Sequence, residues 1–426
     1  MLKKIPVTQV RLGMYLQALE GAWIDHPFWK TRFVIRSTAD LHHLQGSVIT
    51  ECWIDLDKGL DEAEPVEQGA TAQPARLSST PAMNGVTNDA TNDATNGATV
   101  RAAPVPDSQP FDDELKRAAA VCNRGRAAVM AMFNEARMGR TIDAANCLPL
   151  VEDITASVFR NPDALVSLAR LKTQDDYCYM HSVAVCALMV ALARQLNFDD
   201  DDCRVAGLAG LLHDVGKALM PLDVLNKPGR LTDAEYSLMR THAERGHELL
   251  LQGRDMPPQA LEVALHHHER FDGSGYPHGL VGEGINLFAR MGAVCDVYDA
   301  ITSNRPYKEG WDPAESIAKM ASWKGHFDES IFAAFVHSLG IYPTGSLVRL
   351  KSGLLAVVVE QVAGALMTPK VRVFFNTRNQ MPVEPRLLDL SRPRVADRIT
   401  GRESNADTKF AHLDSLWAEP ADLGRR

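Results

Sequence analysis

The chain has 426 residues, of which 45% are hydrophobic and 23% are charged, as is usual for a folded protein of two or three domains. Its formal net charge of −9 disfavours nonspecific binding to DNA or RNA, because such binding depends on surplus Lys and Arg that neutralise phosphates. The seven cysteines form no CxxC pair and lack the dense spacing of a secreted disulfide scaffold, so we expect them to be reduced.

No segment resembles a targeting signal or a membrane anchor. The stretch from Met1 to Arg11 has no apolar region after its lysines, and the most apolar run, from Val183 to Ala193, is too short to cross a bilayer. We therefore predict a cytoplasmic protein without a membrane span.

The first part of the chain divides into three predicted segments. Short runs of Trp, Ile, Val and Phe between turns predict a small β or α/β module over residues 1–60. Residues 61–110 repeat Thr, Asn, Asp and Ala and contain few large apolar residues, which predicts a flexible linker or an exposed insertion. Residues 111–147 carry a helical apolar period, so we expect a connecting helix that could also serve a homodimer.

The rest of the chain is predicted to be helical first and β-structured afterwards. Residues 148–340 show successive helical segments ended by Pro or Gly, and Thr232 with Glu235 forms a capping box that begins one of them. Residues 341–393 contain short β-like runs and predict an antiparallel appendix, and residues 394–426 are polar and predict a mobile tail. The expected fold is thus mainly α.

Histidines and aspartates concentrate in the helical region. They lie at the ends or on the apolar faces of separate helical segments, from which several helices could bring them to one point, as bundles do in di-iron sites. Imidazole and carboxylate ligands together suit Fe, Mn or Zn, and one carboxylate can bridge two ions. The residues are His181, His213, Asp214, His242, His267, His268 and Asp296.

Three motifs resemble the HD-GYP family. They are His213-Asp-Val-Gly-Lys217, then His267-His-Glu-Arg-Phe-Asp-Gly-Ser-Gly-Tyr-Pro277, then the segment from Asp296 to Lys308 that includes Arg305. Residues 1–60 also resemble the uncharacterised module that often precedes such domains. The resemblance implies an HD-type helical bundle that hydrolyses the bacterial second messenger cyclic di-GMP.

The resemblance also assigns roles within the site. It makes the seven residues above the ligands of two divalent metal ions, with Asp214 bridging the two ions. Fe and Mn are the metals that we expect first. Some members hold a third metal through a Glu one turn before the first His, but here this position is Tyr177. We therefore expect a two-metal site, and linear pGpG rather than GMP as the main product.

Chemistry assigns roles to further residues. Two ions would lower the pKa of a bridging water, and the resulting hydroxide would attack the phosphodiester. Asp214 and Lys217 are the predicted catalytic residues, with Lys217 either neutralising developing charge or protonating the leaving ribose oxygen. Arg305 and Lys308 are predicted to bind a phosphate of the substrate. Gly275, Tyr276 and Pro277 are also predicted to bind substrate. Gly275 permits close approach of the backbone, and Tyr276 stacks near a guanine or lines the entrance.

Alternatives stay open for these residues and for the function. His267 and His268 alone could be a surface polar run, and His266, Asp272 and Asp299 are better explained by support of their neighbours than by ligation. The chain could instead hydrolyse another nucleotide, or act as a non-catalytic cyclic di-GMP receptor or signalling adaptor. A diguanylate cyclase or another signalling protein could be its partner, although no residue identifies one.

Overall fold

The computed structural model describes residues 2–19, 33–35, 38–45, 50–60, 111–171, 177–227, 229–303, 310–362, 364–403, 410 and 413–418. The predicted linker over residues 61–110 lies outside these ranges, as does part of the predicted N-terminal module, including its Trp-Ile run at Trp23 and Ile24. The chain divides into two compact units, Met1–Pro106 and Asp107–Arg426, and each is described by itself.

The N-terminal unit is a small antiparallel sheet with one helix. Its strands follow the order β1-β4-β2-β3, and its core contains Met14, Leu16 and Ile54, all fully buried. This agrees with the predicted small β or α/β module, although neither β1 nor β2 was among the segments predicted to form strands. The elements are β1 Leu2–Pro6, η1 Val7–Gln9, β2 Tyr15–Leu19, β3 Phe33–Val34, α1 Thr38–Gln45 and β4 Glu51–Asp55.

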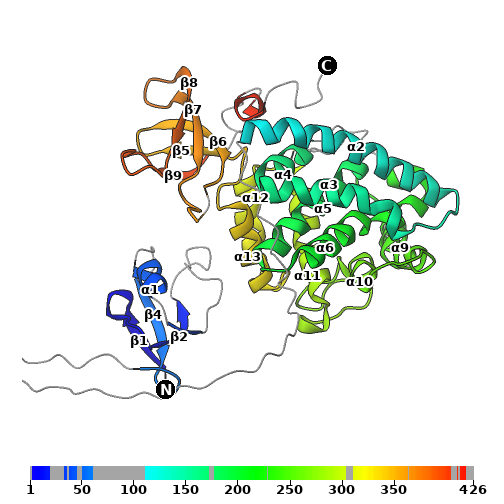
Figure 1. Cartoon of the computed structure of the whole chain (residues 1–426), viewed down its shortest axis with the longest axis horizontal. Helices are drawn as coiled ribbons and strands as arrows, with labels where there is room; N and C mark the ends of the chain where they lie inside the picture. Colours follow the sequence, from blue (N-terminus) through cyan, green and yellow to red (C-terminus); the bar gives the residue numbers. More distant parts are fainter. Residues whose placement is uncertain are drawn as a thin grey trace, which may run out of the picture. The chain divides into compact units, whose positions relative to one another are not determined.

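The second unit is mainly a helical bundle, as predicted (Figure 1). Helix α5 runs through its middle and packs against α2, α3, α4, α6, α11 and α13. The helices are α2 Phe111–Arg137, α3 Ala144–Arg160, α4 Pro162–Arg170, α5 Tyr177–Gln195, α6 Asp200–Leu212, η3 Val215–Leu219, α7 Leu222–Leu225, α8 Asp233–Arg240, α9 His242–Leu251, α10 Pro258–His266, η4 Gly282–Gly284, α11 Leu287–Thr302, α12 Pro313–Ala321 and α13 Glu329–Leu339.

Local capping explains where several of these helices begin. The side chain of Asn161 accepts hydrogen bonds from the backbone nitrogens of Asp163 and Ala164 at the start of α4. At α8 the predicted capping box is confirmed, since Thr232 Oγ1 accepts from Glu235 N and the Glu235 carboxylate accepts from Thr232 N. These caps explain why α4 begins at Pro162 and α8 at Asp233.

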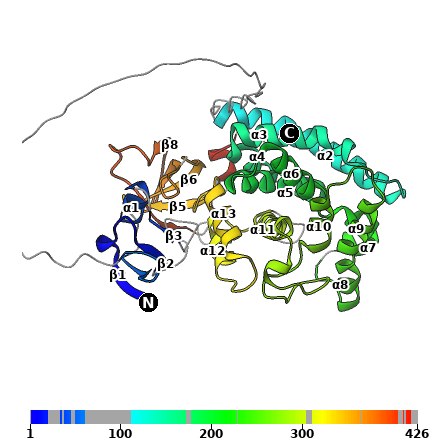
Figure 2. The same ribbon diagram turned by 60° about the horizontal axis from the view of Figure 1, so that its bottom comes forward.

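Helix α5 is long and apolar enough to cross a membrane by length and composition. The window Cys178–Gln195 is, however, 78% buried inside the unit. The surrounding helices in Figure 2 make the same point, because α5 lies beneath α3 and α4 and beside α6. It is therefore the core helix of a folded domain, and its apolar character follows from burial on all sides.

The C-terminal part is a five-stranded antiparallel sheet with the order β8-β7-β6-β5-β9. The β-like runs predicted within residues 341–393 form β5, β6 and β7, and β8 and β9 extend the sheet at its two edges. Strand β9 lies within the predicted mobile tail but pairs with β5, with Arg349 opposite Gly401. The elements are β5 Leu347–Leu350, β6 Leu354–Glu360, β7 Lys370–Asn376, β8 Met381–Asp389, β9 Ile399–Arg402 and η5 Leu413–Leu416.

Polar contacts join this sheet to the helical bundle. The Asp163 carboxylate at the start of α4 accepts a hydrogen bond from Gln361 N at 2.9 Å, and Asp312 at the start of α12 accepts from Leu347 N at 2.9 Å. Both carboxylates lie in the buried boundary between the bundle and the sheet, where each satisfies a backbone donor.

Candidate metal centre and active site

Five separate helical segments contribute side chains to one buried cluster. His181 lies one turn after the start of α5, His213 and Asp214 directly follow α6, and His242 begins α9. His267 and His268 directly follow α10, and Asp296 lies within α11. All seven are buried except His268, whose side chain is 23% exposed. The structure thus brings all seven sequence-predicted residues together.

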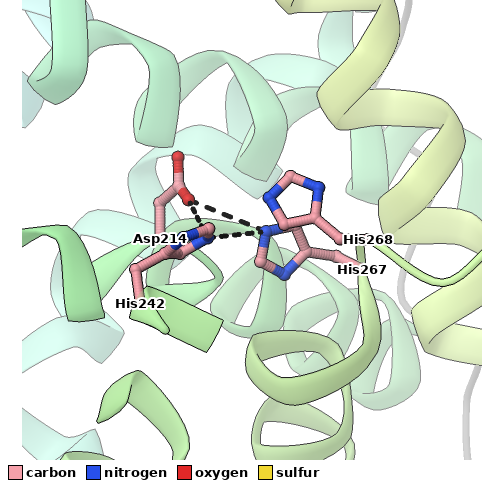
Figure 3. A group of neighbouring side chains, drawn as sticks. All are labelled: Asp214, His242, His267 and His268. Atoms are coloured by element: carbon pink, nitrogen blue, oxygen red, sulfur yellow. Dashed lines mark hydrogen bonds and ion pairs between the residues drawn. The ribbon is translucent and has the colours of Figure 1, made fainter. Parts of the chain in front are cut away.

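Asp214 lies between two groups of imidazoles. Its Oδ1 is 3.3 Å from Nε2 of His242 and 3.7 Å from Nε2 of His267, and Figure 3 shows both rings turned toward this carboxylate. Its Oδ2 is 3.3 Å from Nε2 of both His181 and His213. The two carboxylate oxygens therefore face different partners, an arrangement that suits a bridge between two cations.

Asp296 is the second carboxylate of the cluster and, like Asp214, directs its two oxygens to different histidines. Its Oδ1 lies 3.0 Å from Nε2 of His181, and its Oδ2 lies 3.8 Å from Nδ1 of His268. The described residues include two sets of potential metal ligands. Inside each set, the ligand atoms all lie within 4.8 Å of one another. One set is Asp214, His242, His267 and His268, and the other is His181, His213 and Asp296.

Backbone carbonyls orient three of the imidazoles. Nδ1 of His213 donates to the Gly210 carbonyl at 2.8 Å, Nδ1 of His242 to that of Met239 at 2.7 Å, and Nδ1 of His267 to that of Val263 at 2.9 Å. A carbonyl oxygen can only accept, so Nδ1 carries the proton in each neutral ring. Nε2 is left with its lone pair directed into the cluster, as in histidines that bind metals.

The cluster places acceptor atoms against one another. Nε2 of His213 is 3.2 Å from Nε2 of His181, and Nε2 of His242 is 3.5 Å from Nε2 of His267. Asp214 Oδ1 is buried and makes no hydrogen bond within the described part of the chain. Such facing lone pairs are unfavourable without a positive charge between them, so the residues fit divalent cations.

The protonation states also suit cation binding. Burial lowers the pKa of His213 and of His242 below the usual value, and burial together with the neighbouring His267 lowers the pKa of His268 well below it. Burial alone would raise the pKa of Asp214, but the Lys217 charge and the imidazoles hold it well below its usual range. At neutral pH these three imidazoles are therefore neutral and the Asp214 carboxylate is ionised.

Two residues contact the cluster from just outside it. Asp299, one turn after Asp296 on α11, places Oδ2 2.6 Å from Nδ1 of His181 and so orients that ring. Lys217 on η3 places Nζ 2.5 Å from Asp214 Oδ2. Burial would lower the pKa of Lys217, but the Asp214 and Asp296 carboxylates raise it, so its charge is retained beside the cluster.

The loop after His268 covers one side of the cluster. The Tyr276 ring stacks on His268 with a centroid separation of 4.7 Å, and Pro277 follows it. At Gly275 a Cβ atom would lie 2.3 Å from Arg270 N, so only glycine permits the loop to return this closely to its own start. The predicted phosphate-binding residues Arg305 and Lys308 lie outside the described residues.

Sequence reasoning missed three residues of this region. The buried Glu269 carboxylate accepts from the backbone nitrogens of His278, Gly279 and Leu280, and so holds the loop after Tyr276. A Cβ on Gly216 would lie 1.9 Å from the His242 carbonyl oxygen, which makes this glycine necessary for the approach of α9. Glu269 and Gly216 lie inside the three sequence motifs, so their positions could have been singled out from the sequence. Arg240, which contacts Tyr276, lies outside those motifs, and its surrounding residues gave no indication of this contact.

Family models divide the chain in a way that agrees with this site. A model described as a domain of unknown function, DUF3391, matches residues 2–147, and an HD domain model matches residues 156–331. The second match spans every residue of the cluster. The fold and the cluster thus define an HD-domain protein.

Three relatives carry the comparison further. The Pseudomonas aeruginosa protein named Cyclic di-GMP phosphodiesterase PA4108 is 52% identical over 98% of this chain and 96% of its own length. The Xanthomonas campestris protein named Cyclic di-GMP phosphodiesterase response regulator RpfG is 48% identical over 32% of this chain and 36% of its own. A Vibrio cholerae protein named 3'3'-cGAMP-specific phosphodiesterase 2 is 35% identical over 47% of this chain and 37% of its own. The chain belongs to the HD-GYP family, in the group that joins a DUF3391 domain to the HD domain.

Proposed function

We propose that this chain is a metal-dependent phosphodiesterase that hydrolyses cyclic di-GMP, mainly to linear pGpG. The observation that carries the proposal is the placement of Asp214, whose two oxygens face separate imidazole groups, in a chain 52% identical to a protein named as a cyclic di-GMP phosphodiesterase. A phosphodiester resists attack because its anionic oxygens repel a nucleophile, and this cluster is suited to cations that offset that repulsion.

The seven residues of the cluster would hold two divalent ions, with Fe or Mn the best match for their mixed imidazole and carboxylate donors. When bound, such a pair supplies Lewis-acid stabilisation of phosphoryl oxygens and makes a nearby water more acidic. The backbone carbonyls behind His213, His242 and His267 keep these rings oriented and their Nε2 atoms free of protons.

The chain's own residues would supply the remaining chemistry. The Lys217 ammonium beside Asp214 would offset the negative charge that develops on the phosphoryl group, or donate a proton to the leaving ribose oxygen. Gly275, Tyr276 and Pro277 would line the substrate entrance, and Arg305 and Lys308 would bind a phosphate of the dinucleotide. Because Tyr276 already stacks on His268, we favour a role for it at the entrance.

The expectation of pGpG as product depends on Tyr177. This residue begins α5, one turn before His181, where a third metal would require a carboxylate. A tyrosine is a poor ligand at this position, so the chain would open the ring with one cleavage and release the linear dinucleotide.

One experiment tests metal, activity and product together. The protein is purified without oxygen, its Fe and Mn are counted, and its products from cyclic di-GMP are separated by chromatography. We expect close to two ions per chain and pGpG as product, with the activity reduced at least about a hundredfold by His213→Ala or Asp214→Ala. Bound metal without turnover in any metal or reductant condition would instead favour a non-catalytic receptor.

A second substrate is favoured by one observation. The similarity to the Vibrio cholerae protein named as 3'3'-cGAMP-specific extends over 202 residues at 35% identity. Rates for cyclic di-GMP, 3'3'-cGAMP and other nucleotides should therefore be compared in one panel. If kcat/KM were higher for another nucleotide than for cyclic di-GMP, that nucleotide would become the proposed substrate.

A further inference from the structure

Arg240, the last residue of α8, lies against the loop that covers the metal centre. Its guanidinium carbon is 4.3 Å from the centroid of the Tyr276 ring, and the side chain is exposed. Within the described ranges it makes no ion pair. An exposed, unpaired cation next to an active site that acts on an anion is a candidate ligand-binding group.

Stacking prepares this guanidinium for an anion. When an arginine lies over an aromatic ring, its N–H groups remain in the plane of the guanidinium and stay free for a bidentate contact. Tyr276 itself rests on His268, so one aromatic ring connects Arg240 to the cluster. The arginine is thereby oriented without losing its donors.

Arg240 makes no ion pair with the carboxylates of the centre. The ion pairs of Asp214 and Asp296 are made with His181, His213, His242, His267, His268 and Lys217. A cyclic dinucleotide carries two phosphates, and the cluster can act on one of them at a time. The second phosphate keeps its negative charge throughout the reaction. Arg305 and Lys308 are proposed for one phosphate only, so the other phosphate needs a further positive group.

We propose that Arg240 binds the phosphate that is not being cleaved, holding it through the N–H edge of a guanidinium stacked on Tyr276. This inference rests on the proposed cyclic dinucleotide hydrolysis and names the group that recognises the second phosphate. Tyr236, one helical turn earlier on the same face of α8 and 53% exposed, adds an aromatic ring next to this contact.

The test compares Arg240→Ala and Arg240→Lys with Arg245→Ala. Arg245 on α9 is also exposed and has no side-chain ion pair in the described part of the chain, so its removal changes the net charge equally. We expect Arg240→Ala to raise KM for cyclic di-GMP about tenfold to a hundredfold with kcat nearly unchanged, because the contact is equal in the ground and transition states. Arg240→Lys should recover part of this, and Arg245→Ala should behave like the wild type.

Two further ligands distinguish a contact with the second phosphate from a contact with a guanine and from a structural role. Bis(p-nitrophenyl) phosphate has one phosphate and no base, so its hydrolysis should be unchanged in Arg240→Ala if the metal centre is intact. GpG keeps both guanines and has one phosphate, so its inhibition constant should also be unchanged. An equal loss for GpG would assign Arg240 to a guanine, and an equal loss for bis(p-nitrophenyl) phosphate would assign it to the structure of the centre; either result overturns the proposal.

Failure of the proposed function can be recognised separately. The affinity for cyclic di-GMP is measured by calorimetry on protein kept free of metal, where no turnover occurs. A wild type that binds cyclic di-GMP without hydrolysing it would overturn the phosphodiesterase activity alone, and the Arg240→Ala comparison would still be decided by the dissociation constants. Unchanged affinity in Arg240→Ala would overturn the inference.

Discussion

Oδ2 of Asp299 lies 2.6 Å from Nδ1 of His181, so the carboxylate orients the ring whose other nitrogen faces Asp214 and Asp296. Groups that hydrogen-bond to metal-binding histidines commonly change metal affinity tenfold to a hundredfold when removed. We expect Asp299→Ala to weaken metal binding by about this factor, and Asp299→Asn, which can still accept a hydrogen bond, to weaken it less. Metal titration by calorimetry checks this, and equal affinities in all three proteins would contradict it.

Gly216 determines how closely α9 approaches η3. A Cβ at this position would lie 1.9 Å from the His242 carbonyl oxygen and 2.6 Å from Gly246 N, both of them backbone atoms that cannot turn away. We expect Gly216→Ala to displace His242, to lower the free energy of unfolding by about 3 kcal/mol and to reduce metal content. Gly284→Ala is the control, because no atom lies within 4 Å of its Cβ position. Chemical denaturation and metal counting of both variants would show the difference, and equal stability would refute the packing explanation.

Lys217 contributes charge to the centre without being a metal ligand. Its ammonium lies 2.5 Å from Asp214 Oδ2 and has no lone pair to donate to a cation. We expect Lys217→Ala to lower kcat about a hundredfold while the metal content stays close to that of the wild type. Lys217→Arg should keep more activity, because it keeps the charge. If metal content fell in parallel with kcat, Lys217 would instead be needed to hold the carboxylate in place.

Asp163 makes the stability of the bundle and sheet sensitive to pH. Burial raises the pKa of its carboxyl from the ordinary 3.8 to about 7, although the hydrogen bond from Gln361 N lowers it in part. The folded protein therefore keeps a proton that the unfolded chain has released between about pH 3.8 and pH 7. The free energy of unfolding must then fall as the pH rises through this window.

Asparagine at position 163 can accept the same backbone hydrogen bond and carries no charge. We expect Asp163→Asn to be more stable than the wild type at pH 8, by roughly 4 kcal/mol at most, and to differ little at pH 4. Asp200→Asn, which removes an exposed carboxylate from the first turn of α6, is the control. Thermal unfolding across this pH range measures the effect, and parallel curves for Asp163→Asn and the wild type would count against it.

Local sequence determined the parts of this protein that depend on neighbours along the chain. The Thr232 and Glu235 capping box lies within one turn, and the apolar runs of β5, β6 and β7 have the β-like pattern of buried strands. The order of the histidines and aspartates along the helical region likewise identified the seven residues that the structure brings together. These features could be predicted because residue type and spacing already specify them.

Elements with weak local patterns were not predictable in the same way. Strand β8 is largely exposed and β9 contains Gly401 within a polar segment, so neither has a clear apolar alternation. Strand β9 forms because β5, about fifty residues earlier, presents an unpaired edge. Such pairing is decided by distant residues, which a local pattern does not contain.

The sequence by itself determined the family, the mainly helical fold and the residue types of the centre. Only the tertiary structure decided that Asp214 directs one oxygen to His242 and the other to His181, that Asp299 supports His181, and that Arg240 lies over Tyr276. The physical reason is that these contacts join helices separated by tens of residues, and their geometry depends on how the helices pack around α5.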